Sequence, residues 1–209
     1  MTVGEYLSVF ASFILALAVA ELVLGLHRLL RHREHIEWDW MTPAMALLVM
    51  FNIITFWWAT YRWYGSGSNP SILGFLPDVA TFVVLFLMSA AVFPDDVPEQ
   101  GLSLREFYRS QARYIWSLQV LILILVVVFV APRKFDGWQA VVVDQSHNII
   151  AAFVLSFVAW TKRMWIHQIA IVALIGMAFT GWLNIKLDER NKDDQATPKQ
   201  TAPTSQSAR

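Results

Sequence analysis

The sequence predicts an all-α fold, a polytopic membrane bundle of six transmembrane helices, from three observations. Six apolar segments have close to the ~20 residues that a helix needs to cross the hydrocarbon of a bilayer, and a bilayer offers no water to unpaired backbone groups, so such spans should be helical. Charged residues make up only 15% of the 209 residues, against about 25% in ordinary soluble domains. Ten tryptophans gather near the segment ends. The segments are Gly4–Leu26, Trp40–Tyr61, Ser71–Phe93, Tyr114–Ala131, Trp138–Trp160 and Met164–Trp182.

The first segment is predicted to be a retained transmembrane helix rather than a cleaved signal peptide. Met1–Ser8 contains no Lys or Arg, and apolar residues continue past the small residues Ala18–Ala20 to Leu26. Small residues also recur along this segment at intervals of seven, and a second helix can approach such a stripe closely. They are Gly4, Ala11, Ala18 and Gly25.

The second and third segments contain isolated polar residues. Asn52 and Thr55 share one helical face near the middle of the second segment, and we expect Asn52 to form a packing contact between helices. In the third segment, Asp78 directly follows Pro77.

The fourth segment is preceded by a helix start with its own sequence pattern. Ser103 and Glu106 have the spacing of a capping box, which predicts a juxtamembrane helix that begins near Leu104. Three arginines recur every four residues on one face of this helix: Arg105, Arg109 and Arg113. This face is interpreted either as a contact for anionic lipid headgroups or as a solvated cytoplasmic face.

The fifth and sixth segments contain a second polar group. Asp144, His147 and Asn148 are spaced i, i+3 and i+4 and share one face near the start of the fifth helix. Thr180 and Asn184 approach the same depth from the sixth segment.

The C-terminal residues differ sharply in composition. From Lys186 onward the chain is polar with almost no large apolar residue, so it cannot bury a core and should be disordered. The sequence therefore predicts a transmembrane domain over residues 1–185 and a disordered polar tail over residues 186–209.

Basic residues predict the orientation in the membrane. The first, third and fifth connections contain eight Lys or Arg residues, namely Arg28, Arg31, Arg33, Arg105, Arg109, Arg113, Lys162 and Arg163. The opposite connections contain three before the tail, namely Arg62, Arg133 and Lys134. The positive-inside rule places the larger group in the cytoplasm and both termini outside it.

Tryptophans mark both predicted boundaries and are interpreted as interfacial anchors. The predicted cytoplasmic boundary has Trp38, Trp40, Trp116, Trp160 and Trp165, and the other has Trp57, Trp58, Trp63, Trp138 and Trp182.

Several classes of chemistry are disfavoured. The chain has no cysteine and a formal net charge of zero, which argues against thiolate metal sites, cysteine nucleophiles and a nucleic-acid partner. His27, His32 and His35 match no zinc spacing. His147 and His167 fall near opposite surfaces, so they cannot ligate one haem. No Walker loop, dinucleotide fingerprint or hydrolase motif occurs, and we expect no cofactor, no metal and no enzymatic activity.

Glu21 is the most informative polar residue inside a span. It flanks the small-residue stripe, so it should face the bundle, where a charge costs roughly 2.5–3.5 kcal/mol. Two interpretations remain open: a proton or cation site, or a structural carboxyl bonded to Gln119, Asn52 or an arginine of another helix. Arg28 lies ~10 Å along the same helix, too far for direct pairing unless its side chain folds back.

A second candidate site combines Asp78, Asp144 and His147 toward the opposite leaflet. An Asp–His pair could relay protons, because imidazole titrates near neutral pH. The same residues could instead be wet at the interface and cap the start of the helix.

Parts of the sequence resemble a family of uncharacterised bacterial multi-pass membrane proteins. The resemblance rests on Tyr6–Leu30, Trp38–Trp40, Phe56–Trp58, Ala90–Pro94 and the arginine-rich residues 105–114. It covers about the first two thirds of the chain and implies a bacterial inner-membrane location, but it implies no activity.

Two hypotheses for function follow. The first, which we favour, is a non-enzymatic membrane scaffold or partner-binding component whose polar residues specify packing, and which forms homo- or hetero-oligomers. The second is a small transporter or proton-coupled channel that uses the buried carboxylates. A transporter should have a cavity that joins those carboxylates, and inverted repeats would support it.

Overall fold

The computed structural model describes residues 3–65, 71–133, 135 and 137–196. Within these residues the chain is almost entirely helical, which confirms the all-α fold class. The α-helices are α1 (Val3–Arg31), α2 (Met41–Gly65), α3 (Ile72–Val92), α4 (Leu104–Leu125), α5 (Trp138–Asp144), α6 (Ser146–Trp160) and α7 (Met164–Ala196). Five of them are long and apolar enough to cross a membrane, or six spans if α5 and α6 count as one, so the fold is compatible with a multi-pass membrane protein.

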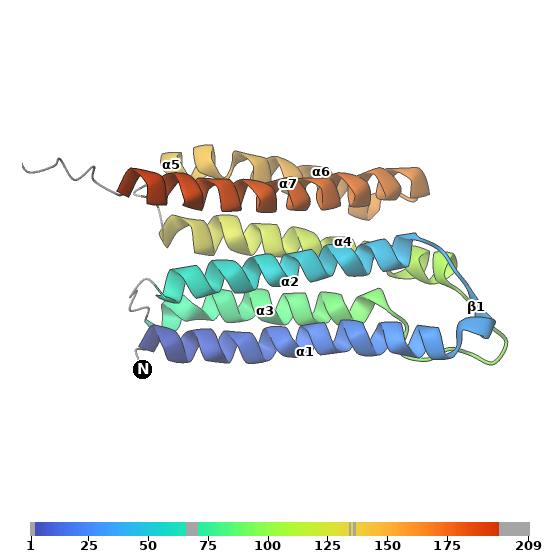
Figure 1. Cartoon of the computed structure of the whole chain (residues 1–209). Coiled ribbons are helices and arrows are strands. Elements are labelled where there is room, and N and C mark those ends of the chain that lie inside the picture. The colour runs from blue at the N-terminus through green and yellow to red at the C-terminus, as the bar shows by residue number, and fades with distance from the viewer. Residues whose placement is uncertain (1–2, 66–70, 134, 136, 197–209) are drawn as a thin grey trace, which may run out of the picture.

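The helices form an elongated bundle (Figure 1). α1 packs against α2 and α3, and α4 packs against α3 and α6. Two short strands, β1 (Ile36–Glu37) and β2 (Leu102–Ser103), lie at one end, which we call the β end. The start of α1 and the C-terminal part of α7 both lie toward the opposite end, which we call the N-terminal end (Figure 1).

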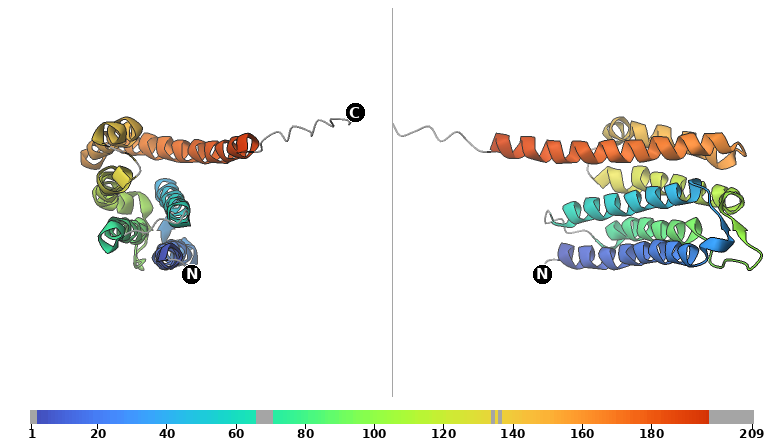
Figure 2. Two further views of the ribbon diagram at one scale, coloured as in Figure 1. Left: turned by 90° about the vertical axis from the view of Figure 1, so that its left-hand side faces the viewer. Right: turned by 45° about the vertical axis from the view of Figure 1, so that its right-hand side comes forward.

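The last helix diverges from the rest of the bundle. In the left view of Figure 2, α1 to α4 are seen along their axes, whereas α7 runs across the view and its C-terminal part lies away from them. Of its candidate span Met164–Gly181 only 11% is buried, compared with 50% for Leu73–Val92 of α3. Much of α7 is therefore uncovered, although α7 also packs against α2.

The small-residue stripe of α1 lies in the helix interface. All four members, Gly4, Ala11, Ala18 and Gly25, are buried. A Cβ added at Gly25 would lie 2.7 Å from the ring of Phe93, just beyond α3, so the two elements meet at a distance that only glycine allows there. Phe93 also marks the end of α3, in extended backbone.

The fifth predicted span is broken, which corrects the expectation of one straight helix over Trp138–Trp160. α5 and α6 meet at Gln145 with a bend of 66°. The break falls in the polar residues, where Gln145 donates to the carboxylate of Asp144 and accepts from the amide of Asn148. Gln145 itself has φ −92° and ψ 11°, outside the α-helical region, so the direction of the backbone changes at this residue.

The capping box predicted before α4 is not formed. Ser103 is the N-cap residue, as its spacing indicated, but its side chain makes no capping hydrogen bond. Ser103 instead lies in β2, which pairs in parallel with β1 through Ile36 opposite Leu102 and Glu37 opposite Ser103. The pairing of β1 with β2 fixes the backbone just before α4, where a side-chain cap was expected. The sequence did not indicate this pairing.

One predicted interfacial tryptophan is a core residue. Trp116 is fully buried, and its indole N–H is hydrogen-bonded to Tyr108 and His167. Other tryptophans at the predicted boundaries are at least one third exposed, as an interfacial position requires: Trp38, Trp40, Trp57, Trp58, Trp138, Trp160 and Trp165.

The predicted polar tail begins inside α7. The helix continues to Ala196, ten residues past the predicted boundary at Lys186. Residues 197–209 lie outside the described residues.

Candidate functional site

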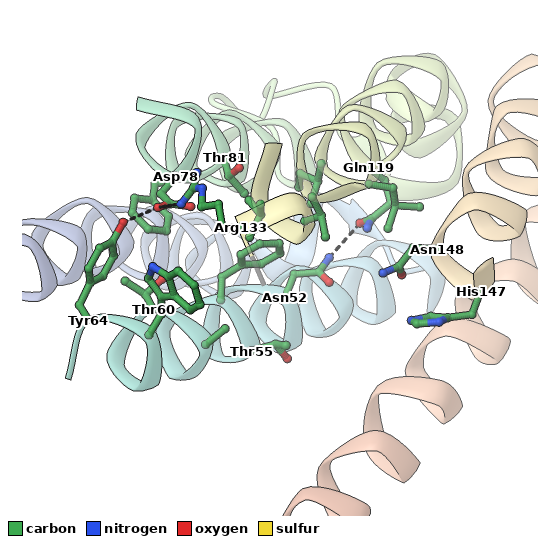
Figure 3. Close-up of a pocket in the computed structure, with 18 residues that line it drawn as sticks. Asn52, Thr55, Thr60, Tyr64, Asp78, Thr81, Gln119, Arg133, His147 and Asn148 are labelled. Carbon is green, nitrogen blue, oxygen red and sulfur yellow. Dashed lines mark hydrogen bonds and ion pairs between the residues drawn. The ribbon is translucent and has the colours of Figure 1, made fainter. Parts of the chain in front are cut away.

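A polar cavity of about 390 Å³ lies between α2, α3, the end of α4 and the start of α6, toward the N-terminal end (Figure 3). Apolar side chains such as Phe82, Ile122 and Val126 form part of its wall. The polar lining residues are Asn52, Thr55, Thr60, Tyr64, Asp78, Thr81, Gln119, Arg133, His147 and Asn148. The cavity brings together polar side chains from four helices that are otherwise mostly apolar, so we take it as the candidate site.

An ion pair anchors one side of this cavity. Nη1 of Arg133 donates to Oδ2 of Asp78 at 2.8 Å, and the hydroxyl of Tyr64 donates to the same oxygen. Asp78 is 9% and Tyr64 1% exposed. The three residues come from three elements, so the carboxylate ties the ends of α2 and α3 to the segment after α4.

Local structure brings Arg133 inward. After α4 the chain continues as a π-helical turn, η2 (Val126–Val130), and a short 3₁₀ turn, η3 (Ala131–Arg133). A π turn is wider than an α turn and changes the direction of the side chains that follow it, and such turns are frequent at functional sites. The sequence placed Arg133 only among the connecting charges, and the turn is what returns it to Asp78.

The guanidinium of Arg133 is not fully satisfied. Its Nη2 is buried and has no hydrogen-bond partner among the described residues. A buried donor without an acceptor costs about 1–3 kcal/mol, so this group favours any ligand or partner that brings an acceptor.

A second hydrogen bond crosses the cavity wall between α2 and α4. The amide of Asn52 donates to Oε1 of Gln119 at 2.8 Å, and Gln119 is 5% exposed. Asn52 was predicted to pack between helices, and Gln119 was named as one partner for Glu21. The two amides bond each other instead.

Glu21 lies elsewhere and has a partner on its own helix. Nη2 of Arg28 donates to Oε1 of Glu21 at 2.9 Å, with side chains that are 36% and 25% exposed. The long side chain of Arg28 folds back along α1, so it reaches Glu21 although the two residues lie ~10 Å apart along the helix axis. Glu21 is not among the described residues that line the cavity.

The predicted Asp78, Asp144 and His147 cluster is only partly assembled. His147 lines the cavity from the first turn of α6, on the side opposite Asp78 (Figure 3). Asp144 belongs to α5 across the bend, is exposed, and accepts from Gln145. Thr180 is exposed on α7 and bonds carbonyls of its own helix, and the side chain of Asn184 lies outside the described residues.

Sequence reasoning missed Tyr64 and Arg133 as parts of the site. One signal was available: a carboxylate within an apolar span, as at Asp78, needs a cation or donors at its own depth. Arg62, Arg133 and Lys134 are the basic residues predicted on that side of the membrane before the tail, so this requirement reduces the candidate cations for Asp78 to three.

The predicted headgroup arginines lie on the exposed face of α4 near the β end. Arg105, Arg109 and Arg113 are all exposed. The guanidinium carbon of Arg113 lies 4.1 Å from the ring centre of Trp160 on α6.

No protein-family model matches the chain, and no curated protein or solved structure is similar to it. Membership of the bacterial membrane-protein family that the sequence resembles therefore stays a prediction.

Proposed function

We propose that the protein is a non-enzymatic, partner-binding component of a bacterial inner membrane, with the β end in the cytoplasm and both termini outside it. The observation that carries this proposal is a polar cavity that is open at its side, between helices, in the apolar part of the bundle. Lipid chains cannot satisfy the polar groups of such a cavity, whereas a transmembrane helix of another protein with a hydrogen-bond acceptor can.

The uncovered surfaces next to the cavity support this proposal. Thr55 and His147 line the cavity and are exposed. α7 packs against α2, but its C-terminal part lies away from the bundle (Figure 2). The unsatisfied Nη2 of Arg133 favours a partner that supplies a carbonyl, amide or carboxylate oxygen. Hydrogen bonds of this kind between helices in membranes are typically worth about 0.6–2 kcal/mol.

The runner-up is a small transporter or proton-coupled channel. One observation favours it: Asp78 and His147 line the same cavity, on opposite sides. Two observations weigh against it. Asp78 is held by two donors, and among the described lining residues neither Glu21 nor Asp144 occurs.

In-membrane photo-crosslinking tests the proposal. A photoreactive amino acid at Thr55 should give a discrete crosslinked partner in cells, whereas one at Leu24, which is exposed on α1 away from the cavity, should not. Thr60→Leu should abolish the Thr55 crosslink because it fills the cavity with apolar volume. Thr180→Leu, on the exposed face of α7, is the matched control and should leave the crosslink intact.

Two results would overturn the partner-binding function. One is identical crosslinks at Thr55 and Leu24, which would indicate random membrane neighbours. The other is proton flux into liposomes of the purified protein that is lost in His147→Gln, which would establish the transporter.

Cysteine labelling tests the proposed orientation. The chain has no native cysteine, so Glu99→Cys at the β end and Gln139→Cys in α5 each introduce a single exposed thiol. A membrane-impermeant reagent should label Gln139→Cys in intact cells and Glu99→Cys only after the inner membrane is permeabilised. The reverse pattern would invert the topology.

A further inference from the structure

A second cavity, of about 280 Å³, lies at the β end between α4 and the connection from α6 to α7. Its lining contains three cations, Arg109 and Arg113 on α4 and Lys162 in the connection, and no carboxylate among the described lining residues. Arg109 and Arg113 are four residues apart on one helical face, where like charges repel. The three cations therefore favour an anion that comes from outside the chain.

The floor of this cavity is fixed by a buried hydrogen-bond network around His167, which is 2% exposed. Nδ1 of His167 lies 3.0 Å from the indole nitrogen of Trp116, and Nε2 lies 3.0 Å from the carbonyl oxygen of Thr161. An indole N–H can only donate, so Nδ1 accepts and Nε2 carries the hydrogen that Thr161 receives. The network ties the connection to α4 and positions Lys162 beside the arginines.

One wall of the cavity is aromatic. Arg113 lies over the ring of Trp160 at 4.1 Å, a distance typical of a cation–π contact. Trp160 and Trp165 are 72% and 56% exposed, as expected for tryptophans at the level of lipid headgroups.

An exposed apolar stripe leads away from the cavity along α6. Phe153, Phe157 and Trp160 share one helical face and are each more than 60% exposed. This stripe lies on the side of the cavity that leads toward the middle of the span, where an acyl chain of a bound lipid would run.

We propose that this cavity binds the phosphate headgroup of an anionic phospholipid, with its acyl chain along Phe153 and Phe157. Arg109, Arg113 and Lys162 supply charge-assisted hydrogen bonds to the phosphate oxygens, and the guanidinium fork suits their geometry. Basic pockets between transmembrane helices on the cytoplasmic side bind lipid headgroups in this way. The site is distinct from the polar cavity at the other end, so either function can fail without the other.

The experiment measures retention of lipid by native mass spectrometry of the intact protein, with phosphatidylglycerol against phosphatidylcholine. Wild type should retain phosphatidylglycerol preferentially, and the double variant Arg109→Gln/Arg113→Gln should lose that preference by about tenfold, since each basic residue contributes roughly a fewfold change in affinity. Arg105→Gln removes the same charge from the same helix face outside the cavity, and its preference should change less than twofold.

A substitution in the apolar stripe distinguishes a bound lipid from a bound free anion. Phe157→Ser should weaken phosphatidylglycerol retention without a change in charge, and inorganic phosphate should not displace the lipid. Displacement by inorganic phosphate would show a free-anion site instead. An equal loss in Arg105→Gln, or no preference for phosphatidylglycerol in wild type, would show unspecific surface charge and overturn the proposal. Gel filtration of each variant confirms that it is folded.

Discussion

The two cavities at opposite ends of the bundle differ in whether their cations are paired with a carboxylate. At the N-terminal end, Arg133 is neutralised by Asp78 within the fold, and its buried Nη2 has no acceptor among the described residues. At the β end, three cations share a cavity with no carboxylate among the described lining residues. The charge in the first cavity is therefore compensated within the fold, whereas the cations of the second are proposed to bind an anion from outside.

The difference has a consequence for stability. In a buried ion pair, the attraction between the two charges offsets the large cost of removing them from water. When one member is removed, the other keeps that desolvation cost without the attraction. An exposed cation keeps its solvation, so its removal costs little. Substitutions at the two ends should therefore differ in size and in their dependence on lipid.

The largest effect is expected at Asp78. Asp78→Leu leaves the guanidinium of Arg133, which is 20% exposed, without its counter-charge and also removes the acceptor for Tyr64, so it should lower the free energy of unfolding by about 3 kcal/mol. Unfolding in detergent with increasing denaturant measures this. The double variant Asp78→Leu/Arg133→Met should recover most of the loss, and a double variant no more stable than the single one would contradict the internal pairing.

The next largest effect is expected at His167. His167→Phe keeps the volume of the ring but removes the donor to the carbonyl of Thr161 and leaves the hydroxyl of Tyr108 as the remaining acceptor for the indole N–H of Trp116, so it should cost about 1–2 kcal/mol. It should also weaken phosphatidylglycerol retention, although no cation of the cavity is altered, because Lys162 loses its fixed connection. His167→Gln, which retains an acceptor and donors, should restore part of both. Unchanged lipid retention in a folded His167→Phe would separate the network from the cavity.

The span pattern was predictable because the length of a transmembrane helix is a local property of the sequence. The bilayer sets about 20 apolar residues for each span, and the segment Met164–Trp182, for example, falls within α7. The break between α5 and α6 was not predicted, because the i, i+3 and i+4 spacing of Asp144, His147 and Asn148 also fits one face of a continuous helix. The parallel pairing of β1 and β2 joins residues more than sixty positions apart, and no local sequence pattern indicates a contact over that distance.

The sequence predicted two members of the candidate site but not their contacts. Asp78 and His147 were named from their polarity within apolar segments, and both line the cavity. Arg133 was not named, because its return to Asp78 depends on a π turn and on a contact across 55 residues. Trp116 fits an interfacial position by its place in the sequence, but its hydrogen-bond partner His167 is 51 residues away.

A smaller effect is expected at Glu21, whose ion pair with Arg28 contrasts with the buried pair of Asp78. Both members are partly exposed, and pairs of this kind are worth about 0–1 kcal/mol. Glu21→Gln keeps hydrogen-bonding capacity, so the free energy of unfolding in detergent should change by less than about 1 kcal/mol. A loss as large as that in Asp78→Leu would mean that Glu21 is buried in the membrane-embedded protein and belongs with the internally paired charges. Cation flux in liposomes that vanishes in Glu21→Gln would instead favour a transport site.

The smallest effect, and the one most dependent on conditions, is expected at Arg109. In a detergent without anionic lipid, Arg109→Gln relieves repulsion from Arg105 and Arg113 and loses the attraction of Glu106, so its stability should stay within about 0.5 kcal/mol of wild type. Added phosphatidylglycerol should raise the Tm of wild type, because a ligand that binds only the folded state stabilises it by mass action. The rise should be much smaller in Arg109→Gln and unchanged in Arg105→Gln. If the lipid raised the Tm of all three proteins equally, the cations of the β end would act only as a diffuse surface charge, and the contrast between the two cavities would rest on the Asp78 pair alone.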